Sequence, residues 1–378
     1  MKTTRRKIGF VADVHVHNFP RFGGPARVGV NGRCRLVVEA LERACAAAYA
    51  DGCSDLVVLG DLFDRSDPSP QVLRAARDAL VAHPLERVWL LTGNHDQVSS
   101  EPGDHAFAPL DGFYREGGPR ISVVDEPGWR LPGGAVVAFV PFRPGDARGW
   151  LAGALAEAVD QRPSGPLIVA LHLGIVDTDT PAFLRKAHDA IELPDLGYLA
   201  QRCGASAVLA GNWHRRRLWQ HGEVAVVQVG ALCPTGFSDA GSTGYGTLAV
   251  YDSDEDSLAW EEVPGPRFLS GAMPEVSAQL AEAQRDQENE SFVRVKAARV
   301  EMEEALAWLA ARRASGDVAD GEVVVDEFEA RAAAATAAHA ARHAGTLEDA
   351  LAHYVTAMDL PDGVDRQAVL EQVRGYLT

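Results

Sequence analysis

The sequence has few cysteines, and they follow no pattern typical of metal binding or disulfide pairing. Its 378 residues include five cysteines, with no CxxC pair and no zinc-type spacing. An odd number of cysteines, scattered through apolar surroundings, indicates reduced and buried thiols, as is typical of the cytoplasm. We therefore predict a cytoplasmic protein without a disulfide framework or a thiolate metal cluster.

Long hydrophobic runs and an excess of basic charge are also missing. No stretch is long enough to span a membrane, and the apolar run after Lys7 is interrupted at Asp13, too early for a secretion signal. Acidic residues number 53 against 36 basic ones, giving a formal net charge of -17. Because nucleic-acid binders normally carry a basic surface, this balance argues against a free-standing, high-affinity one. It does not exclude a nuclease, since carboxylates that hold metal ions contribute to the count.

Short apolar runs alternate with helical patterns up to about residue 262. Their length, β-branched content and flanking Gly or Pro favour buried strands. These runs are Ile8–Ala12, Leu56–Leu59, Val88–Leu91, Val136–Val140, Leu167–Leu171, Ala207–Ala210, Val224–Val229 and Thr247–Tyr251. Helices are predicted at Arg33–Ala50 and Gln71–Ala82. Because consecutive strands replace the alternation after residue 205, we expect an α/β fold with a mixed sheet, or two sheets packed face to face, and helices outside.

The composition changes at Pro264-Gly265-Pro266, where we place a domain boundary. We divide the chain into a domain at 1–264, a small α+β unit at 265–343 and a helical segment at 344–378. The later elements are predicted at Phe292–Val295, Glu301–Arg313, Val323–Val325, Arg331–Arg342 and Thr346–Met358. In the first of these helices Leu306, Trp308 and Leu309 are expected to face inward. The apolar stripe of the last segment either completes the core of the small unit or docks on a partner.

Polar side chains directly follow five of the predicted strands. The strand ends read Asp13-Val14-His15, Gly60-Asp61-Leu62-Phe63-Asp64, Gly93-Asn94-His95-Asp96, His172 and Gly211-Asn212-Trp213-His214. If the strands are neighbours, these groups converge on one volume at the carboxyl edge of the sheet. A mixed set of oxygen and imidazole donors suits Mn²⁺, Fe or Zn²⁺. Each piece alone is more often an ordinary turn, but five together predict a shared metal site.

The third of these strand ends also offers a candidate for proton transfer. His95 is a proton donor of suitable chemistry beside the predicted ligands, and Asp96 can accept from its second ring nitrogen and orient it. We therefore predict His95 and Asp96 as catalytic residues.

The order D-x-H, G-D-x-x-D, G-N-H-D, H and G-x-x-H resembles the calcineurin-like metallophosphoesterase superfamily over roughly residues 7–252. The resemblance implies a four-layer α-β-β-α sandwich that holds two divalent metal ions. It implies that the first metal is held by Asp13, His15 and His214, that Asp61 bridges both metals, and that the second is held by Asn94 and His172. His95 would assist departure of the leaving oxygen, with Asp96 orienting it and Asp64 supporting the ligands from outside.

One position departs from the family pattern. The family normally has His where this chain has Asn212, and that His would ligate the second metal. A neutral amide is a weaker donor than imidazole to Mn²⁺ or Zn²⁺. We therefore expect a functional but weaker second site that includes Asn212. A structural subunit with a decayed metal site is the alternative that this residue supports.

A narrower resemblance concerns Gly60-Asp61-Leu62-Phe63-Asp64 followed by Pro68-Ser69, which is similar to the SbcD nuclease branch. In that branch a small α+β cap and terminal helices follow the phosphoesterase core, and the helices dock on the coiled coil of the SbcC ATPase. The resemblance implies a DNA exonuclease or endonuclease, with Mn²⁺ as the expected metal and Fe or Zn²⁺ as alternatives. It implies DNA, an SbcC-like coiled-coil ATPase and a second copy of the chain as partners, and no membrane.

Local basic groups exist despite the acidic balance. Arg21 and Arg27 lie in the first loop, Arg65 follows the second motif, and Arg215-Arg216-Arg217 follows His214. For the triple arginine, a solvated turn and a phosphate contact are equally supported. We expect four residues to contact substrate or to support the ligands: Asp64, His17, Arg65 and Arg215. The acidic charge also supports an alternative function, a phosphodiesterase or phosphatase acting on small molecules or phosphoproteins.

Overall fold

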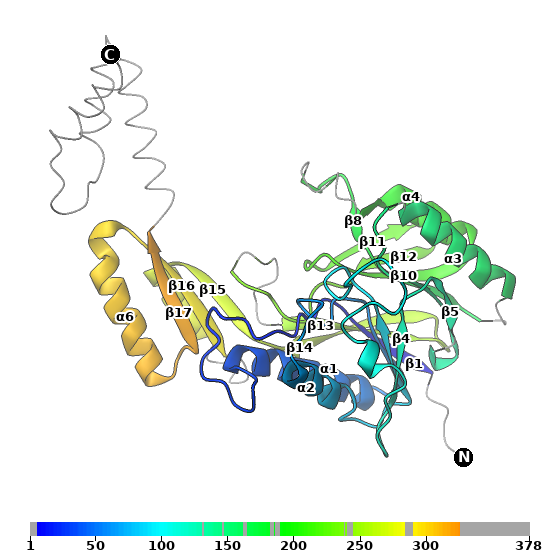
Figure 1. The fold of residues 1–378 in the computed structure, drawn as a ribbon. Helices are drawn as coiled ribbons and strands as arrows, with labels where there is room; N and C mark the ends of the chain where they lie inside the picture. Colours follow the sequence, from blue (N-terminus) through cyan, green and yellow to red (C-terminus); the bar gives the residue numbers. More distant parts are fainter. Residues whose placement is uncertain are drawn as a thin grey trace, which may run out of the picture.

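The computed structural model describes residues 6–130, 132–145, 147–161, 165–181, 185, 190–237, 239, 245–283 and 290–325. Figure 1 shows these as two sheets with outer helices and a separate smaller sheet, drawn in yellow and orange. The helices predicted at Arg331–Arg342 and Thr346–Met358, and the whole segment 344–378, lie outside the described residues.

The first sheet has the strand order β14-β13-β1-β2-β3-β4. Its strands are β1 (Lys7–Val11), β2 (Cys53–Val58), β3 (Arg87–Leu91), β4 (Arg120–Val124), β13 (Tyr245–Asp252) and β14 (Ser257–Pro264). The strands from β1 to β4 run parallel, so their carboxyl ends meet at one edge. Helices α1 (Gly32–Ala50) and α2 (Pro70–Leu80) are capped by Asn31 and Ser69, whose side chains accept hydrogen bonds from backbone N–H groups of the first turn.

The second sheet has the strand order β11-β12-β10-β7-β6-β5. Its strands are β5 (Gly128–Arg130), β6 (Val136–Val140), β7 (Leu167–His172), β10 (Ala205–Gly211), β11 (Arg217–His221) and β12 (Val224–Gln228). Strands β6, β7, β10 and β12 are parallel. This half also contains α3 (Ala147–Gln161), α4 (Leu193–Arg202) and a separate parallel pair, β8 (Gly174–Val176) and β9 (Ala190–Glu192). The 3₁₀ turn Ala108–Leu110 lies against β4, and the 3₁₀ turn Pro132–Gly134 lies against β1 and β2.

The side chains of β2 show how the layers are held together. Leu56 and Val58 pack beneath α1 and α2, whereas Val57 and Leu59 pack against residues of the second sheet such as Phe139. This alternation follows from the two-residue period of a strand. The far face of the second sheet packs on α3 and α4. The four-layer α-β-β-α sandwich is therefore confirmed, as are all the strands and both helices predicted before residue 262.

A smaller unit follows the sandwich, and we call it the cap. It consists of the parallel strands β15 (Arg267–Ala272), β16 (Ser291–Ala297) and β17 (Asp320–Val325), with helices α5 (Met273–Ala283) and α6 (Met302–Ser315) and the 3₁₀ turn Arg299–Glu301. The inward face of α6 differs from the expected one. Leu309 is buried and Trp308 packs half-buried against the core of the cap, as predicted, but Leu306 is 53% exposed and Ala305 is buried in its place. The boundaries at 264 and 343 stay predictions.

Among the described residues, no helix has both the length and the apolar character needed to cross a membrane.

Candidate metal centre

The turns that carry the predicted ligands have an unusual backbone. Asp13, His15, Asp61 and Asn212 adopt positive φ angles of 51°, 53°, 51° and 88°. They make up four of the seven non-glycine residues with positive φ in the described part of the chain. Asp, Asn and His tolerate this region best among residues with a side chain, and such backbone strain clusters at functional sites.

Hydrogen bonds hold these turns against one another. The N–H groups of Val14 and His15 both donate to the Asp61 carbonyl, at 2.9 and 3.0 Å. The Asn212 N–H donates to both carboxylate oxygens of Asp13, at 2.9 and 3.1 Å, which ties a turn of the second sheet to one of the first. Three of the five strand ends, those of Asp13, Asp61 and Asn212, are therefore neighbours.

Two imidazoles are oriented from outside so that Nε2 faces the centre. His172 Nδ1 donates to the Leu59 carbonyl at 2.7 Å, and His214 Nδ1 donates to Asp239 Oδ2 at 2.7 Å. In both rings the outer hydrogen bond leaves Nε2 as the nitrogen that can ligate a metal. His214 Nε2 lies 3.0 Å from His15 Nε2. On the other side of the His15 ring, Nδ1 lies 3.4 Å from Asp64 Oδ1 but forms no hydrogen bond with it. A supporting role for Asp64 stays a prediction.

The carboxylates lie between these imidazoles. Asp61 Oδ1 accepts the His95 N–H at 2.9 Å, and Asp61 Oδ2 lies 3.8 Å from His15 Nε2 and 3.5 Å from His172 Nε2. The position of Oδ2 suits a bridging ligand. The donor atoms of the described residues form three compact groups, each within 4.8 Å: Asp13, His15 and His214; Asp13, Asp61 and His172; and His15, Asp64 and His95. Asp13 belongs to the first two of these ligand groups.

The charges of these groups fit a pair of divalent cations. Asp13 and Asp61 are 0% and 1% exposed, and burial raises the pKa of Asp13. Burial alone would also raise the pKa of Asp61, but His172 and His15 hold it below its usual range. Burial lowers the pKa of His172, yet Asp61 and Asp13 raise it to about 9. Adjacent buried carboxylates need compensating positive charge, which bound cations supply.

The two asparagines differ in how they meet the centre. Asn94 Oδ1 lies 3.0 Å from His172 Nε2, where both could bind one cation. Asn212 contributes its backbone N–H to Asp13 and adopts a φ of 88°, a conformation that Asn tolerates well. Whether the Asn212 amide oxygen ligates a metal stays a prediction.

The predicted pairing of His95 with Asp96 is wrong. His95 is exposed, and its Nδ1 donates to the backbone carbonyl of Asp64 at 2.8 Å. Asp96 is fully buried and accepts the N–H groups of Phe63, at 3.0 Å, and Gly93, at 2.9 Å. Burial, together with the charge of Asp61, raises the pKa of Asp96 to about 7. Asp96 therefore holds the turn that contains Phe63 against the turn that contains Gly93. The carbonyl of Asp64 orients the His95 ring.

The residues expected on the substrate side lie at the periphery. Arg65 is exposed and pairs with Asp67 at 3.1 Å, and Arg215 is exposed beside His214. His17 is half-buried against Phe19, with ring centroids 5.0 Å apart, and belongs to none of the ligand groups.

The three consecutive arginines after His214 lie in different surroundings. Arg217 Nη1 donates to Asp177 Oδ2 at 2.7 Å, and the Arg216 guanidinium lies 5.8 Å from the centre of the Trp260 ring. A contact between Arg215 and a substrate phosphate stays a prediction.

The sequence reasoning missed two parts of the site. Asp239 was not singled out, because the loop between β12 and β13 carries no motif. Asp239 Oδ2 also accepts the Thr235 N–H at 2.7 Å, and hydrogen bonds from His214 and Thr235 hold the Asp239 pKa below its usual value although burial would raise it. The end of β6 was missed as well: Phe142 lies edge-on to the His172 ring, with centroids 6.4 Å apart. Its position two residues after an apolar strand was the available signal.

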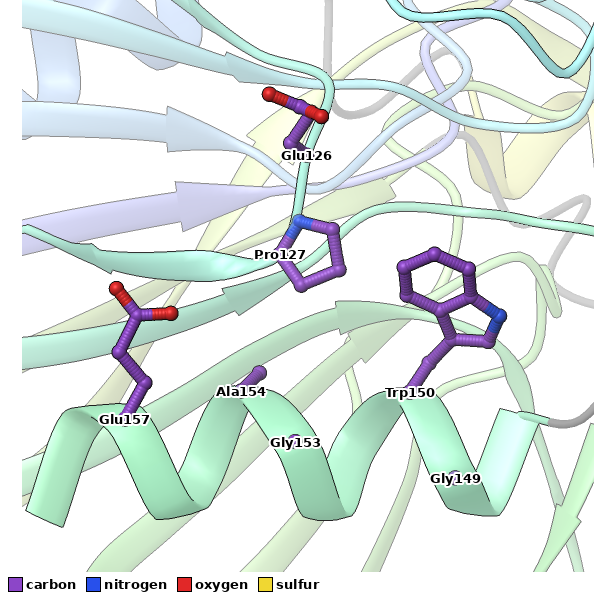
Figure 2. Close-up of a pocket in the computed structure, with 7 residues that line it drawn as sticks. All are labelled: Glu126, Pro127, Gly149, Trp150, Gly153, Ala154 and Glu157. Carbon is purple, nitrogen blue, oxygen red and sulfur yellow. The ribbon is translucent and has the colours of Figure 1, made fainter.

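A groove of about 510 Å³ runs beside α3 on the outside of the second sheet. Figure 2 shows Trp150 and Glu157 rising from α3 towards Pro127, with Glu126 beyond. The groove is lined by Glu126, Pro127, Gly149, Trp150, Gly153, Ala154 and Glu157. None of these residues belongs to the ligand groups, so the groove is separate from the metal centre.

A two-sheet sandwich with carboxylates and imidazoles gathered at its strand ends can hold divalent cations of the kind that activate water for hydrolysis. The chain belongs to the calcineurin-like phosphoesterase family, whose profile matches residues 6–216.

Similar solved structures include TT1561 of Thermus thermophilus, which is 17% identical, with 68% of this chain and 99% of that one covered and a TM-score of 0.41. Another is a dimetal phosphatase from Danio rerio, 13% identical, with 69% and 96% covered and a TM-score of 0.43. A search of the curated proteins finds no significant match. The family assignment rests on the profile match.

Proposed function

We propose that this protein is a phosphodiesterase that uses two divalent metal ions, and that it acts as the DNA nuclease subunit of an SbcC–SbcD-like complex. The observation that carries the metal-dependent chemistry is the pair of ligand groups that share Asp13, with Asp61 Oδ2 lying 3.8 Å from His15 Nε2 of one group and 3.5 Å from His172 Nε2 of the other. The family assignment makes the ester a phosphate ester. The choice of DNA rests on the motif variant around Phe63 and Pro68 and on the cap after residue 264.

The roles of the side chains follow from their contacts. When bound, two divalent cations would supply the Lewis acidity that polarises the phosphoryl group and the attacking water. Asp13, His15 and His214 would hold one cation, and Asn94 and His172, with a contribution from Asn212, the other. Asp61 would set the distance between the two cations through Oδ2, since Oδ1 is engaged by the His95 N–H.

His95 is suited to proton transfer because of how its ring is held. Nδ1 donates to the Asp64 carbonyl, which leaves Nε2 as the nitrogen that can exchange a proton with the leaving oxygen. The ring is exposed, so a substrate can reach it. The His95 and His15 ring centroids lie 5.0 Å apart, which places the proton donor beside the first ligand group.

A nuclease assay tests the proposal. The full-length protein is incubated with linear duplex DNA and Mn²⁺, with and without an SbcC-like coiled-coil ATPase. Cleavage that requires Mn²⁺ and is lost in Asp61→Ala supports the nuclease assignment. A matched control, Asp67→Ala, removes an exposed carboxylate that pairs with Arg65 and should retain activity. Absence of cleavage with either protein mixture contradicts it.

The net charge of -17 favours a second candidate, a phosphodiesterase or phosphatase for small molecules or phosphoproteins. Such substrates do not need the long basic surface that DNA does. The same preparation is therefore assayed with a small chromogenic phosphodiester. Turnover that depends on Mn²⁺, with no cleavage of DNA under the same conditions, would favour this second candidate.

A further inference from the structure

Asp239 connects a predicted metal ligand to a loop outside the motif set. Its Oδ2 accepts the His214 ring N–H at 2.7 Å, the Thr235 N–H at 2.7 Å and the Thr235 hydroxyl at 3.1 Å. The Asp239 side chain is 7% exposed. A carboxylate that accepts the outer N–H of a ligating imidazole fixes the orientation and the tautomer of the ring. The position of the His214 ring therefore depends on where this loop lies.

A buried arginine holds the same loop from the other side. Arg33, in the first turn of α1, is 5% exposed and donates through Nη2 to the Thr235 carbonyl at 2.6 Å. Its guanidinium lies over the rings of Phe19, at 4.0 Å, and Phe268, at 4.9 Å. Phe268 belongs to β15 of the cap. The cap thus contacts the arginine that fixes Thr235.

Aromatic packing provides a second link between the loop and the cap. The Phe237 ring packs edge-on against Phe268, with centroids 5.1 Å apart at an angle of 90°. The guanidinium of Arg294, on β16, lies 4.3 Å from the centre of the Phe237 ring. Phe237 and Asp239 belong to one loop, so the residue that meets the cap and the residue that meets His214 lie close together along the chain.

We propose that Asp239 is a positioning residue for the metal ligand His214, and that the cap sets its position through Phe268, Arg33 and Phe237. This inference rests on the proposed metal centre and adds that the cap helps to form it. A cap that is displaced, for example by a partner, would release the loop and weaken the cation site that His214 serves. The cap is then part of the metal centre rather than only a surface for substrate.

Cation binding to the full-length protein tests both steps without an activity assay. Co²⁺ is titrated by calorimetry, and its visible absorption reports on the ligands. Asp239→Asn keeps the shape of the side chain but removes its charge, so we expect the affinity of one site to fall about 10- to 100-fold. The absorption spectrum should also change, whereas the unfolding midpoint of the metal-free protein should not.

The cap is tested by two variants matched in size and burial. Phe268 and Phe292 are both 2% exposed and stack on each other, but Phe268 is the one that contacts Arg33 and Phe237. Phe268→Ala should weaken the site affected by Asp239→Asn, and Phe292→Ala should leave its affinity close to that of the wild type. Phe268→Leu keeps most of the buried volume and replaces Phe268→Ala if that variant unfolds.

The results separate the two proposals. If Asp239→Asn binds Co²⁺ as tightly as the wild type, with the same spectrum, the positioning role is refuted. Equal affinities for the Phe268 and Phe292 variants would refute the link to the cap. A wild-type protein that binds no Co²⁺ at all would refute the proposed metal centre itself, and this inference with it.

Discussion

Replacement of Gly60 by alanine tests how closely the backbone of the second turn approaches a ligand. Gly60 has a φ of 88°, and an added Cβ would collide with His172 Nδ1 and lie 2.6 Å from its Cγ. The His172 ring cannot move away without losing its hydrogen bond to the Leu59 carbonyl. Gly52 offers a matched control, because its φ of 87° is nearly the same and an added Cβ meets nothing within 4 Å.

The two variants share one cost and differ in another. A side chain in the left-handed region costs about 1–2 kcal/mol in either position. At Gly60 the steric clash adds about 1–3 kcal/mol, as for other overpacked sites. We therefore expect Gly52→Ala to lower the free energy of unfolding by about 1–2 kcal/mol and Gly60→Ala by about 2–5 kcal/mol. Gly60→Ala alone should also displace a metal ligand.

Urea denaturation of the metal-free proteins measures the first difference, and calorimetric titration with Mn²⁺ measures the second. Gly52→Ala should bind Mn²⁺ like the wild type, whereas Gly60→Ala should bind about 10- to 100-fold more weakly, or not at all. If the two variants unfold at the same urea concentration and bind Mn²⁺ equally well, His172 does not occupy the position described and the reasoning fails.

Further predictions concern proton transfer, the second cation and acid stability. His95→Ala should reduce turnover about 10²- to 10⁴-fold and retain the bound metal. Asp61→Ala should remove both turnover and bound metal. Loss of metal from His95→Ala would contradict the roles proposed for these two residues. Asn212→His should tighten binding of the second Mn²⁺, as measured by calorimetry. If the wild type binds no metal and the Asn212→His variant is active, the natural site is a decayed one. Burial alone would raise the pKa of Glu322, but hydrogen bonds from Arg21 and Arg294 hold it below its ordinary value of 4.5. Its ionised form therefore stabilises the fold above about pH 4.5, and this contribution is lost as pH falls through the lowered pKa. The stability difference between wild type and Glu322→Gln, measured by urea denaturation, should shrink below that pH; a constant difference would show that the carboxylate charge is not involved.

The layers and the ligand turns could be predicted because both depend on local sequence. Runs such as Val88–Leu91 are apolar throughout, as buried parallel strands require, and a polar group directly after such a run lies at the sheet edge whatever the loops do. The order of the motifs along the chain then supplied the chemistry of the donors. These inferences needed no contact between distant loops.

The wrong or missing parts depend on directions that the sequence does not contain. Asp96 follows His95 directly, yet the turn points the Asp96 carboxylate into the protein. There it accepts hydrogen bonds from the N–H groups of Phe63 and Gly93. Asp239 is 25 residues from His214 in a loop without a pattern. Leu306 fits the apolar stripe of its helix, but the cap sheet meets a face that Ala305 and Leu309 share. Each outcome is set by tertiary packing rather than by local spacing.

The donors of the centre come from both sheets: Asp13, Asp61 and Asn94 follow strands of one, and His172 and His214 follow strands of the other. A bound ion would therefore link the two sheets of the sandwich. A chain in which only one sheet has formed would supply only part of the ligands. Free metal would select the fully assembled protein, adding about 2.7 kcal/mol to its stability at a concentration of about 100 times the dissociation constant. Cells that run short of the metal would then lose folded protein as well as catalysis.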